Sequence, residues 1–210
     1  MINQVIQLLA LVPSVVFHEV AHGYAADRMG DPTARMAGRL SANPLVHIDP
    51  IGSILLPLSL FLMHSPFIIG SAKPVPFNPS FFRNQKRGIQ IVAVAGPLAN
   101  LLLAVLGSIL LHLFPADNIF GLFFINLCLV NVFLALFNLI PIPPMDGSRI
   151  VMSFLPYKLV LPYMRIERYG MVIIFLLWYL NILNWILLPP AGIILHFLLP
   201  NSILPGVATF

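Results

Sequence analysis

The chain has 210 residues, of which 59% are hydrophobic and 9% are charged, and its mean hydropathy is +0.95. Soluble domains carry about 25% charged residues, so this composition excludes an ordinary soluble protein and indicates an integral membrane protein. The net charge of +4 does not indicate a nucleic-acid partner, because the Lys and Arg residues lie in loops beside apolar segments, where they orient the chain in the bilayer.

The first apolar stretch, residues 2–26, is long enough to span a bilayer and contains the pattern HExxH at residues 18–22. On a helix, His18 and His22 lie one turn apart, so both imidazoles can reach one metal ion. Glu19 is the only charge in this stretch, and such a charge usually faces a polar cavity and works there. The pattern predicts a zinc hydrolase in which Glu19 takes a proton from water. The alternative is a polar patch that hydrogen-bonds to neighbouring helices. The N-terminus lacks the basic residues of a signal peptide, so we expect the stretch to be retained.

Further apolar stretches predict an all-α polytopic membrane protein with about five to six membrane segments. After residues 2–26 they are residues 51–69, 89–114, 119–140, 171–188 and 191–199. Pro189 and Pro190 break the last pair. This pair is either an out-and-back hairpin or one crossing followed by an interfacial helix.

Basic residues predict the topology. They cluster in residues 28–39, 73–87 and 149–168, whereas the connection at residues 115–118 has none. By the positive-inside rule the basic loops face the cytoplasm and the N-terminus lies outside. Residues 51–69 then cannot be a simple crossing, and we expect a re-entrant or surface-lying segment. A spanning helix that contains Pro57 and Pro66 is the alternative.

A catalytic zinc usually has three protein ligands, so HExxH needs a partner elsewhere. Glu167 is the only other Glu and lies in a basic loop. Asp146 directly follows the fourth apolar stretch, after three prolines and before Gly147. The first and fourth stretches run in the same direction in the predicted topology, so Asp146 falls at the depth of the two His residues. Asp146 is therefore either a metal ligand or the N-cap of a following helix.

Three motifs in this order resemble the site-2 protease family of intramembrane zinc metallopeptidases, in its compact form without PDZ or CBS domains. They are FHEVAHGYAADRMGD at residues 17–31, AGPLAN at residues 95–100 and NLIPIPPMDG at residues 138–147. The resemblance implies hydrolysis of a peptide bond in or next to a substrate's transmembrane helix. It implies one zinc ion held by His18, His22 and Asp146, with Glu19 as general base and then acid. It further implies that Asn138 holds the substrate backbone or an oxyanion.

The resemblance also implies a β-containing insertion between the first two core helices. The family often has DGG where this chain has Asp146, Gly147 and Ser148, which leaves the ligand intact. We expect one peptidase domain over residues 1–210, with a core of about 1–150 and a C-terminal helical hairpin at about 168–200. The protein is expected in the plasma membrane as a multi-pass protein, with its active site toward the cytoplasm.

The expected partners are the lipid bilayer and membrane proteins with a transmembrane helix. Two other functions use the same residues. One is a metal transporter, which would be expected to have several ligand clusters along a path. The other is a non-catalytic scaffold that binds membrane helices. Among lesser candidates, Gly96, Pro97 and Asn100 favour helix packing over substrate contact, and His47 favours a loop hydrogen bond over lining the site.

Overall fold

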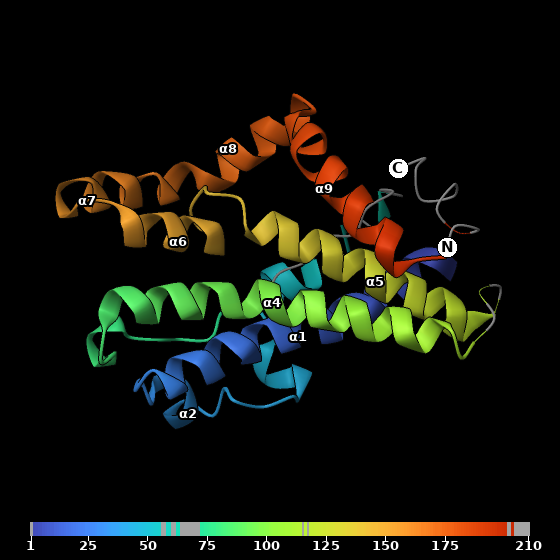
Figure 1. Cartoon of the computed structure of the whole chain (residues 1–210), viewed down its shortest axis with the longest axis horizontal. Coiled ribbons are helices and arrows are strands. Elements are labelled where there is room, and N and C mark those ends of the chain that lie inside the picture. The colour runs from blue at the N-terminus through green and yellow to red at the C-terminus, as the bar shows by residue number, and fades with distance from the viewer. Residues whose placement is uncertain are drawn as a thin grey trace.

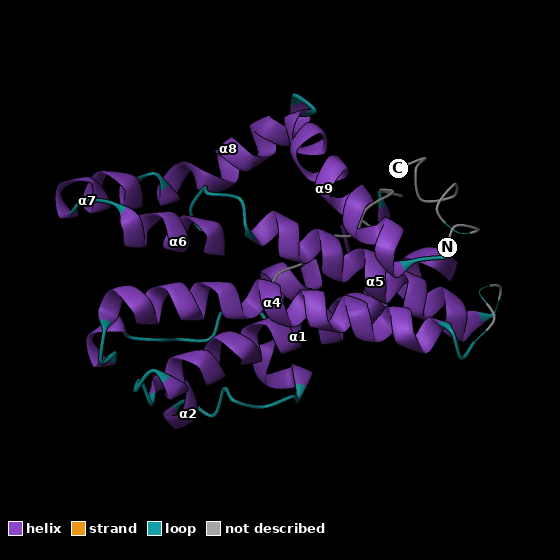
Figure 2. Ribbon diagram, viewed as in Figure 1, coloured by secondary structure: helices purple, strands orange, loops and turns teal. Residues whose placement is uncertain are grey.

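The computed structural model describes residues 2–55, 58–59, 62–63, 72–114, 116, 118–200 and 203. Regular structure in these residues is helical throughout, with no strand (Figure 2). The expected all-α fold is therefore confirmed. The β-containing insertion finds no support in the described part of residues 30–80, which has no strand. Its helical turns include α2 (Thr33–Met36), η1 (Pro44–His47), the π-helical η2 (Pro50–Leu55) and η3 (Pro79–Phe81).

Three described helices are each long and apolar enough to cross a membrane: α1 (Ile2–Arg28), α4 (Gln85–Leu111) and α5 (Ile119–Asn138). A fourth candidate arises if α8 (Glu167–Tyr179) and α9 (Ile182–Leu198) count as one broken span. This number is smaller than the five to six segments expected. The re-entrant segment is expected at residues 51–69, and of these the structure describes only residues 51–55, 58–59 and 62–63.

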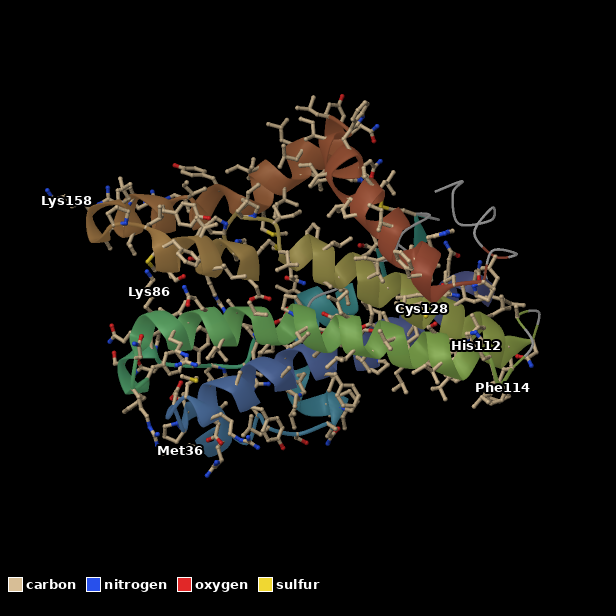
Figure 3. The ribbon with its side chains drawn as sticks, viewed as in Figure 1. Met36, Lys86, His112, Phe114, Cys128 and Lys158 are labelled. Carbon is tan, nitrogen blue, oxygen red and sulfur yellow. The ribbon has the colours of Figure 1, made fainter. Side chains whose placement is uncertain are left out.

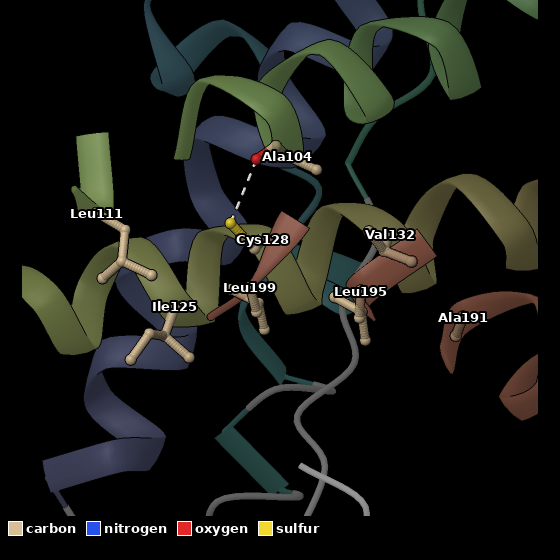
Figure 4. Close-up of a cluster of buried hydrophobic side chains, with 8 residues drawn as sticks. All are labelled: Ala104, Leu111, Ile125, Cys128, Val132, Ala191, Leu195 and Leu199. Carbon is tan, nitrogen blue, oxygen red and sulfur yellow. Dashed lines mark hydrogen bonds between the residues drawn. The ribbon is translucent and has the colours of Figure 1, made fainter. Parts of the chain in front are cut away.

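Helices α1, α4 and α5 pack against one another and form the central bundle (Figure 1). Helix α9 packs on the outer side of α5, and together they bury a cluster of apolar side chains (Figure 4). Within this cluster the Cys128 thiol donates a hydrogen bond to the Ala104 carbonyl oxygen at 3.2 Å, which ties α5 to α4. The bundle thus positions the C-terminal half of α1 against the middle of α4.

Helix α5 ends at Asn138, and Pro141, Pro143 and Pro144 in the following loop cannot continue the helix. The next helix, α6 (Asp146–Phe154), runs beside α4, and α7 (Tyr157–Arg165) follows it (Figure 1). The close turn requires Gly147, because a Cβ there would lie 2.7 Å from the Ile140 carbonyl oxygen and closer still to that of Leu139. This loop places Asp146 beside His18 and His22 of α1.

Charged loops gather at one end of the long axis. Lys86 and Lys158 lie at this end, whereas His112 and Phe114 lie at the other, near the N-terminus (Figure 3). Helices α1 and α5 both run toward the basic end and α4 runs away from it (Figure 1). The relative directions of these three helices agree with the topology expected from the basic loops.

The C-terminal pair differs from its prediction in one respect. Its break lies at Asn181, which has a left-handed φ of 60°, and α8 and α9 meet there at 79°. The break expected at Pro189 and Pro190 is wrong, since both prolines lie inside α9. A left-handed residue ends a helix sharply, whereas neighbouring helices can compensate the donors that prolines remove within the membrane.

Candidate metal centre

The HExxH motif lies in the C-terminal half of α1 and presents both imidazoles to one point. The Nε2 atoms of His18 and His22 are 3.0 Å apart. The Asp146 Oδ2 atom lies 3.2 Å from the first of these nitrogens and 3.1 Å from the second. The three side chains are buried, although 124 residues separate His22 from Asp146 along the chain. Among the described residues, they form the one group with the residue types and spacing to hold a metal ion.

Asp146 stands at the start of α6, yet it is not the N-cap of that helix. The N-cap is Met145, and its side chain makes no capping hydrogen bond. The Asp146 carboxylate instead points at the two imidazoles, so the N-cap alternative is wrong. Ser148, where the family often has glycine, donates its hydroxyl to the Met145 carbonyl oxygen at 2.6 Å, and the turn remains intact.

Helix α4 holds the far side of both imidazoles. The Nδ1 atom of His18 lies 2.6 Å from Asn100 Oδ1, and that of His22 lies 2.7 Å from the Val92 carbonyl oxygen. Partners of this kind orient metal-binding histidines and fix their tautomers. The Asn100 contact was missed from the sequence, although a polar residue in the apolar AGPLAN segment signalled it. The Val92 contact uses a backbone atom, so no residue type reveals it.

The centre needs a cation. A carbonyl oxygen can only accept, so Val92 forces the Nδ1 of His22 to carry the proton, and in the neutral ring this leaves a lone pair on Nε2. The Nε2 atoms of both histidines and the Asp146 Oδ2 atom face one another at hydrogen-bond distance. A proton or a metal ion must bridge them.

The donor set fits zinc. Tetrahedral zinc takes nitrogen and oxygen ligands at about 2.0–2.2 Å, which places neighbouring ligand atoms roughly 3.3 Å apart. The ligand atoms here are 3.0–3.2 Å apart. Two imidazoles and one carboxylate also leave the fourth position open, as in catalytic rather than structural zinc sites.

Gly96 makes room for this arrangement. A Cβ atom at this position would lie 2.6 Å from His18 Cε1 and His22 Cε1, and closer still to His22 Nε2. No side chain larger than hydrogen fits between α4 and the imidazoles. Gly96 therefore allows the close helix packing expected from the sequence, because it lets α4 approach the face of α1 that carries His18 and His22.

Glu19 and Asn138 line the same cavity as the three ligand residues, and the cavity has a volume of about 110 Å³. Glu19 Oε2 accepts a hydrogen bond from the Val75 amide at 2.8 Å. The Asn138 amide donates to the Leu134 carbonyl oxygen at 2.9 Å within α5. The structure thus brings together all five residues singled out from the sequence.

Other acidic and histidine residues have structural contacts away from this cavity. Asp31 accepts hydrogen bonds from the backbone amides of Thr33 and Asn78, and Asp27 pairs with Arg35. His47 bonds through Nε2 to the Ser41 carbonyl oxygen at 2.8 Å, which is the loop contact expected for it.

Comparisons with known proteins agree with this centre. The model of Peptidase family M50 matches residues 115–180, which include the Asn138 and Asp146 motif. The chain is 35% identical over 191 residues to "Putative zinc metalloprotease YwhC" of Bacillus subtilis, covering 87% of this chain and 84% of that one. It is 30% identical over 150 residues to "Putative zinc metalloprotease MJ0611" of Methanocaldococcus jannaschii, covering 70% and 69%. No solved structure matches the chain.

A relative at 35% identity that spans most of both chains establishes the family. Helices with the length and composition of membrane spans agree with a location in the bilayer. Taken with the buried His, His and Asp cluster, these findings show that the chain belongs to Peptidase family M50, as a zinc metalloendopeptidase of the site-2 protease type.

Proposed function

We propose that the protein hydrolyses a peptide bond in or next to the transmembrane helix of a membrane protein substrate. One observation supports this proposal. His18 and His22 lie within α1, which is long and apolar enough to cross the bilayer, and Asp146 is buried beside them. A centre at this depth meets polypeptide that lies within the membrane or at its boundary.

In this proposal His18, His22 and Asp146 hold one zinc ion. When bound, zinc supplies Lewis acidity, which makes water a nucleophile at neutral pH and polarises a carbonyl group. Glu19 takes the proton from the attacking water and returns it to the leaving amine nitrogen. The Val75 amide holds Glu19 Oε2, so the other carboxylate oxygen can face the cavity with its orientation fixed.

Asn138 is proposed to donate a hydrogen bond to the substrate backbone or to the developing oxyanion. Its amide nitrogen has two protons, and the Leu134 carbonyl oxygen takes one of them. The other remains for a group in the cavity that Asn138 lines with the ligand residues. A donor in place before the reaction stabilises charge without reorganising.

The substrate must be unwound locally, because an intact helix has its carbonyl groups bonded to its own amides. The cavity at the metal centre and a larger one of about 270 Å³ share Pro144 and Arg149, which gives flanking substrate residues a place to lie. Pairing of an extended substrate with the chain by strand addition is restricted along residues 74–76. Pro74 and Pro76 lack an N–H group, and that of Val75 is bonded to Glu19. Substrate pairing there has only carbonyl oxygens to use.

We propose a multi-pass protein of the plasma membrane with the metal centre toward the cytoplasm. The support is the gathering of basic loops at the end of the bundle toward which α1 runs. Reporter fusions at the connection near residue 116 and at Lys158 test this topology. A cytoplasmic signal at the first site and a periplasmic or extracellular one at the second would overturn it.

The function is tested with purified protein in liposomes that contain a single-pass membrane protein. Wild-type protein should cleave the substrate within or beside its helix, and a zinc chelator should stop the reaction. Glu19→Gln should lower the rate by about 10²- to 10⁴-fold, because the proton acceptor is lost. Zinc content by elemental analysis should be unchanged in this variant, since Glu19 is not a proposed ligand.

The same preparation separates the other functions. A transporter would move zinc into the liposomes without cutting the substrate, and a scaffold would retain the substrate uncut. Within the described residues there is one ligand cluster and not the series along a path that a transporter would be expected to have. Cleavage that is equal in wild-type and Glu19→Gln protein would contradict the role given to Glu19.

A further inference from the structure

A chain of buried polar groups continues from the metal centre into the apolar bundle. Asn100, which contacts His18, also donates through Nδ2 to Asn131 Oδ1 at 2.7 Å and to the Ser14 carbonyl oxygen at 3.1 Å. Asn131 in turn donates through Nδ2 to Ser14 Oγ at 2.7 Å and to the Leu127 carbonyl oxygen at 2.8 Å. Ser14, Asn100 and Asn131 are each 0% exposed. This series of hydrogen bonds joins α1, α4 and α5. Packing between the three helices would by itself need only apolar side chains.

The direction of every hydrogen bond in this chain is determined. The Leu127 carbonyl oxygen can only accept, so the NH₂ group of Asn131 must face it and Asn131 Oδ1 must face Asn100. The Ser14 carbonyl oxygen likewise fixes the NH₂ group of Asn100. Turning over either amide would set oxygen against oxygen.

The consequence reaches His18. With its NH₂ group committed, Asn100 presents Oδ1 to His18, so His18 Nδ1 must carry the proton, and in the neutral ring Nε2 carries the lone pair that a metal ion needs. The Ser14 hydroxyl completes the chain by donating to the Ala10 carbonyl oxygen at 2.6 Å. No proton on these side-chain amides or on the Ser14 hydroxyl is left unused.

We propose that Asn131 and Ser14 are positioning residues that fix the tautomer of His18 through Asn100, although neither touches the metal centre. The two histidines thus reach the same state by different routes. His22 is set directly by a backbone carbonyl oxygen, and His18 is set by side chains whose direction originates in backbone carbonyl oxygens of α1 and α5. This inference rests on the proposed role of His18 as a metal ligand.

The test is the zinc dissociation constant, measured by chelator competition on purified protein without any substrate. Asn131→Leu removes one of the two acceptors that hold the Asn100 amide, and it should raise the dissociation constant by about 10-fold or more, as loss of a residue that supports a metal ligand does elsewhere. The absorption spectrum of the cobalt-substituted protein should change with it, because the His18 ligand is no longer held in one orientation.

Asn126→Leu is the matched control. Asn126 lies on the same helix and is 4% exposed, but its amide bonds only within α5, to the Leu122 carbonyl oxygen at 2.8 Å. This variant should keep zinc affinity within about twofold of wild type. A general loss of packing would affect both asparagine variants alike, whereas the proposed role affects only Asn131.

Ser14→Ala provides a second variant if Asn131→Leu does not fold. It removes one of the two acceptors of Asn131, so zinc affinity should fall by a few-fold. Ser108 is a buried serine that makes no hydrogen bond to Ser14, Asn100 or Asn131, so Ser108→Ala should leave zinc affinity unchanged. Unchanged affinity and cobalt spectra in folded Asn131→Leu and Ser14→Ala protein would overturn the inference and leave the proteolytic function standing. Zinc binding that survives His18→Ala would instead overturn the ligand assignment.

Discussion

The bundle of α1, α4 and α5 and the C-terminal pair α8 and α9 are both apolar in sequence but differ in what they bury. The bundle encloses serine, asparagine and histidine side chains: Ser14, His18, His22, Asn100 and Asn131. The buried residues of the C-terminal pair are glycine or apolar: Gly170, Ile174, Leu183, Ala191 and Leu195. Its aromatic residues point outward, with Trp178, Tyr179 and Trp185 at 55%, 73% and 80% exposed.

This difference agrees with the proposed site of catalysis in the bundle. Polar side chains inside a membrane protein are expensive and persist where they are paired and used. Exposed Trp and Tyr residues near a helix bend fit a membrane interface. The comparison predicts that changes in the bundle act on the metal and on turnover, whereas changes in the C-terminal pair act on stability.

The largest effect is expected from Gly96→Ala. The added methyl group overlaps both imidazoles, so His18 and His22 cannot keep their places and zinc binding and cleavage should both be lost. Elemental analysis of purified protein measures the zinc. Gly192→Ala on α9 is the control, since a Cβ there meets no atom within 4 Å. Full zinc content in Gly96→Ala protein would contradict the close approach of α4.

A smaller effect is expected from Asn138→Leu. The rate constant for cleavage should fall by about 10²-fold, as when one oxyanion donor is removed, while zinc affinity stays the same. Steady-state kinetics together with chelator competition separate the two quantities. A fall in zinc affinity equal to the fall in rate would place Asn138 among the groups that support the metal instead.

The smallest effect on catalysis is expected from Leu195→Ala in the C-terminal pair. Leu195 is 2% exposed and packs in the cluster with Val132 and Cys128 of α5 (Figure 4). Its truncation should reduce the free energy of unfolding by about 2 kcal/mol or more. Turnover per folded molecule and zinc affinity should be unchanged. If zinc affinity falls in folded Leu195→Ala protein, the division between the two regions fails.

The sequence was sufficient for the parts of the centre that follow from spacing. HExxH on a helix brings His18 and His22 together by geometry alone, and the position of Asp146 after an apolar stretch places it at the same depth. Asp146 remained open between ligand and cap until the structure showed where its carboxylate points. The spacing of two residues on one helix determines whether their side chains point the same way. After a proline-rich turn, the direction of a side chain depends on the conformation of the turn, which the sequence does not give.

Other features depend on contacts between helices and could not be read from the sequence. The hold of Val92 on His22 uses a backbone oxygen, and the hold of Glu19 uses the backbone amide of Val75. The break in the C-terminal pair was placed at Pro189 and Pro190 because prolines interrupt helices in water, but it lies at Asn181. Local residue preferences lose their force where a membrane and neighbouring helices satisfy the backbone.

The grip of α4 on both imidazoles restricts how a substrate can arrive. Its two points of attachment, Val92 and Asn100, are about 12 Å apart along the helix axis, so sliding or parting α4 from α1 would release both rings at once. If substrate entered between α1 and α4, the hydrogen bonds that orient His18 and His22 would break each time the helices separated. The proposed substrate would therefore have to enter from another side, and residues 72–78, whose backbone amides bond to His47, Glu19 and Asp31 rather than to either ring, form part of the cavity rim there.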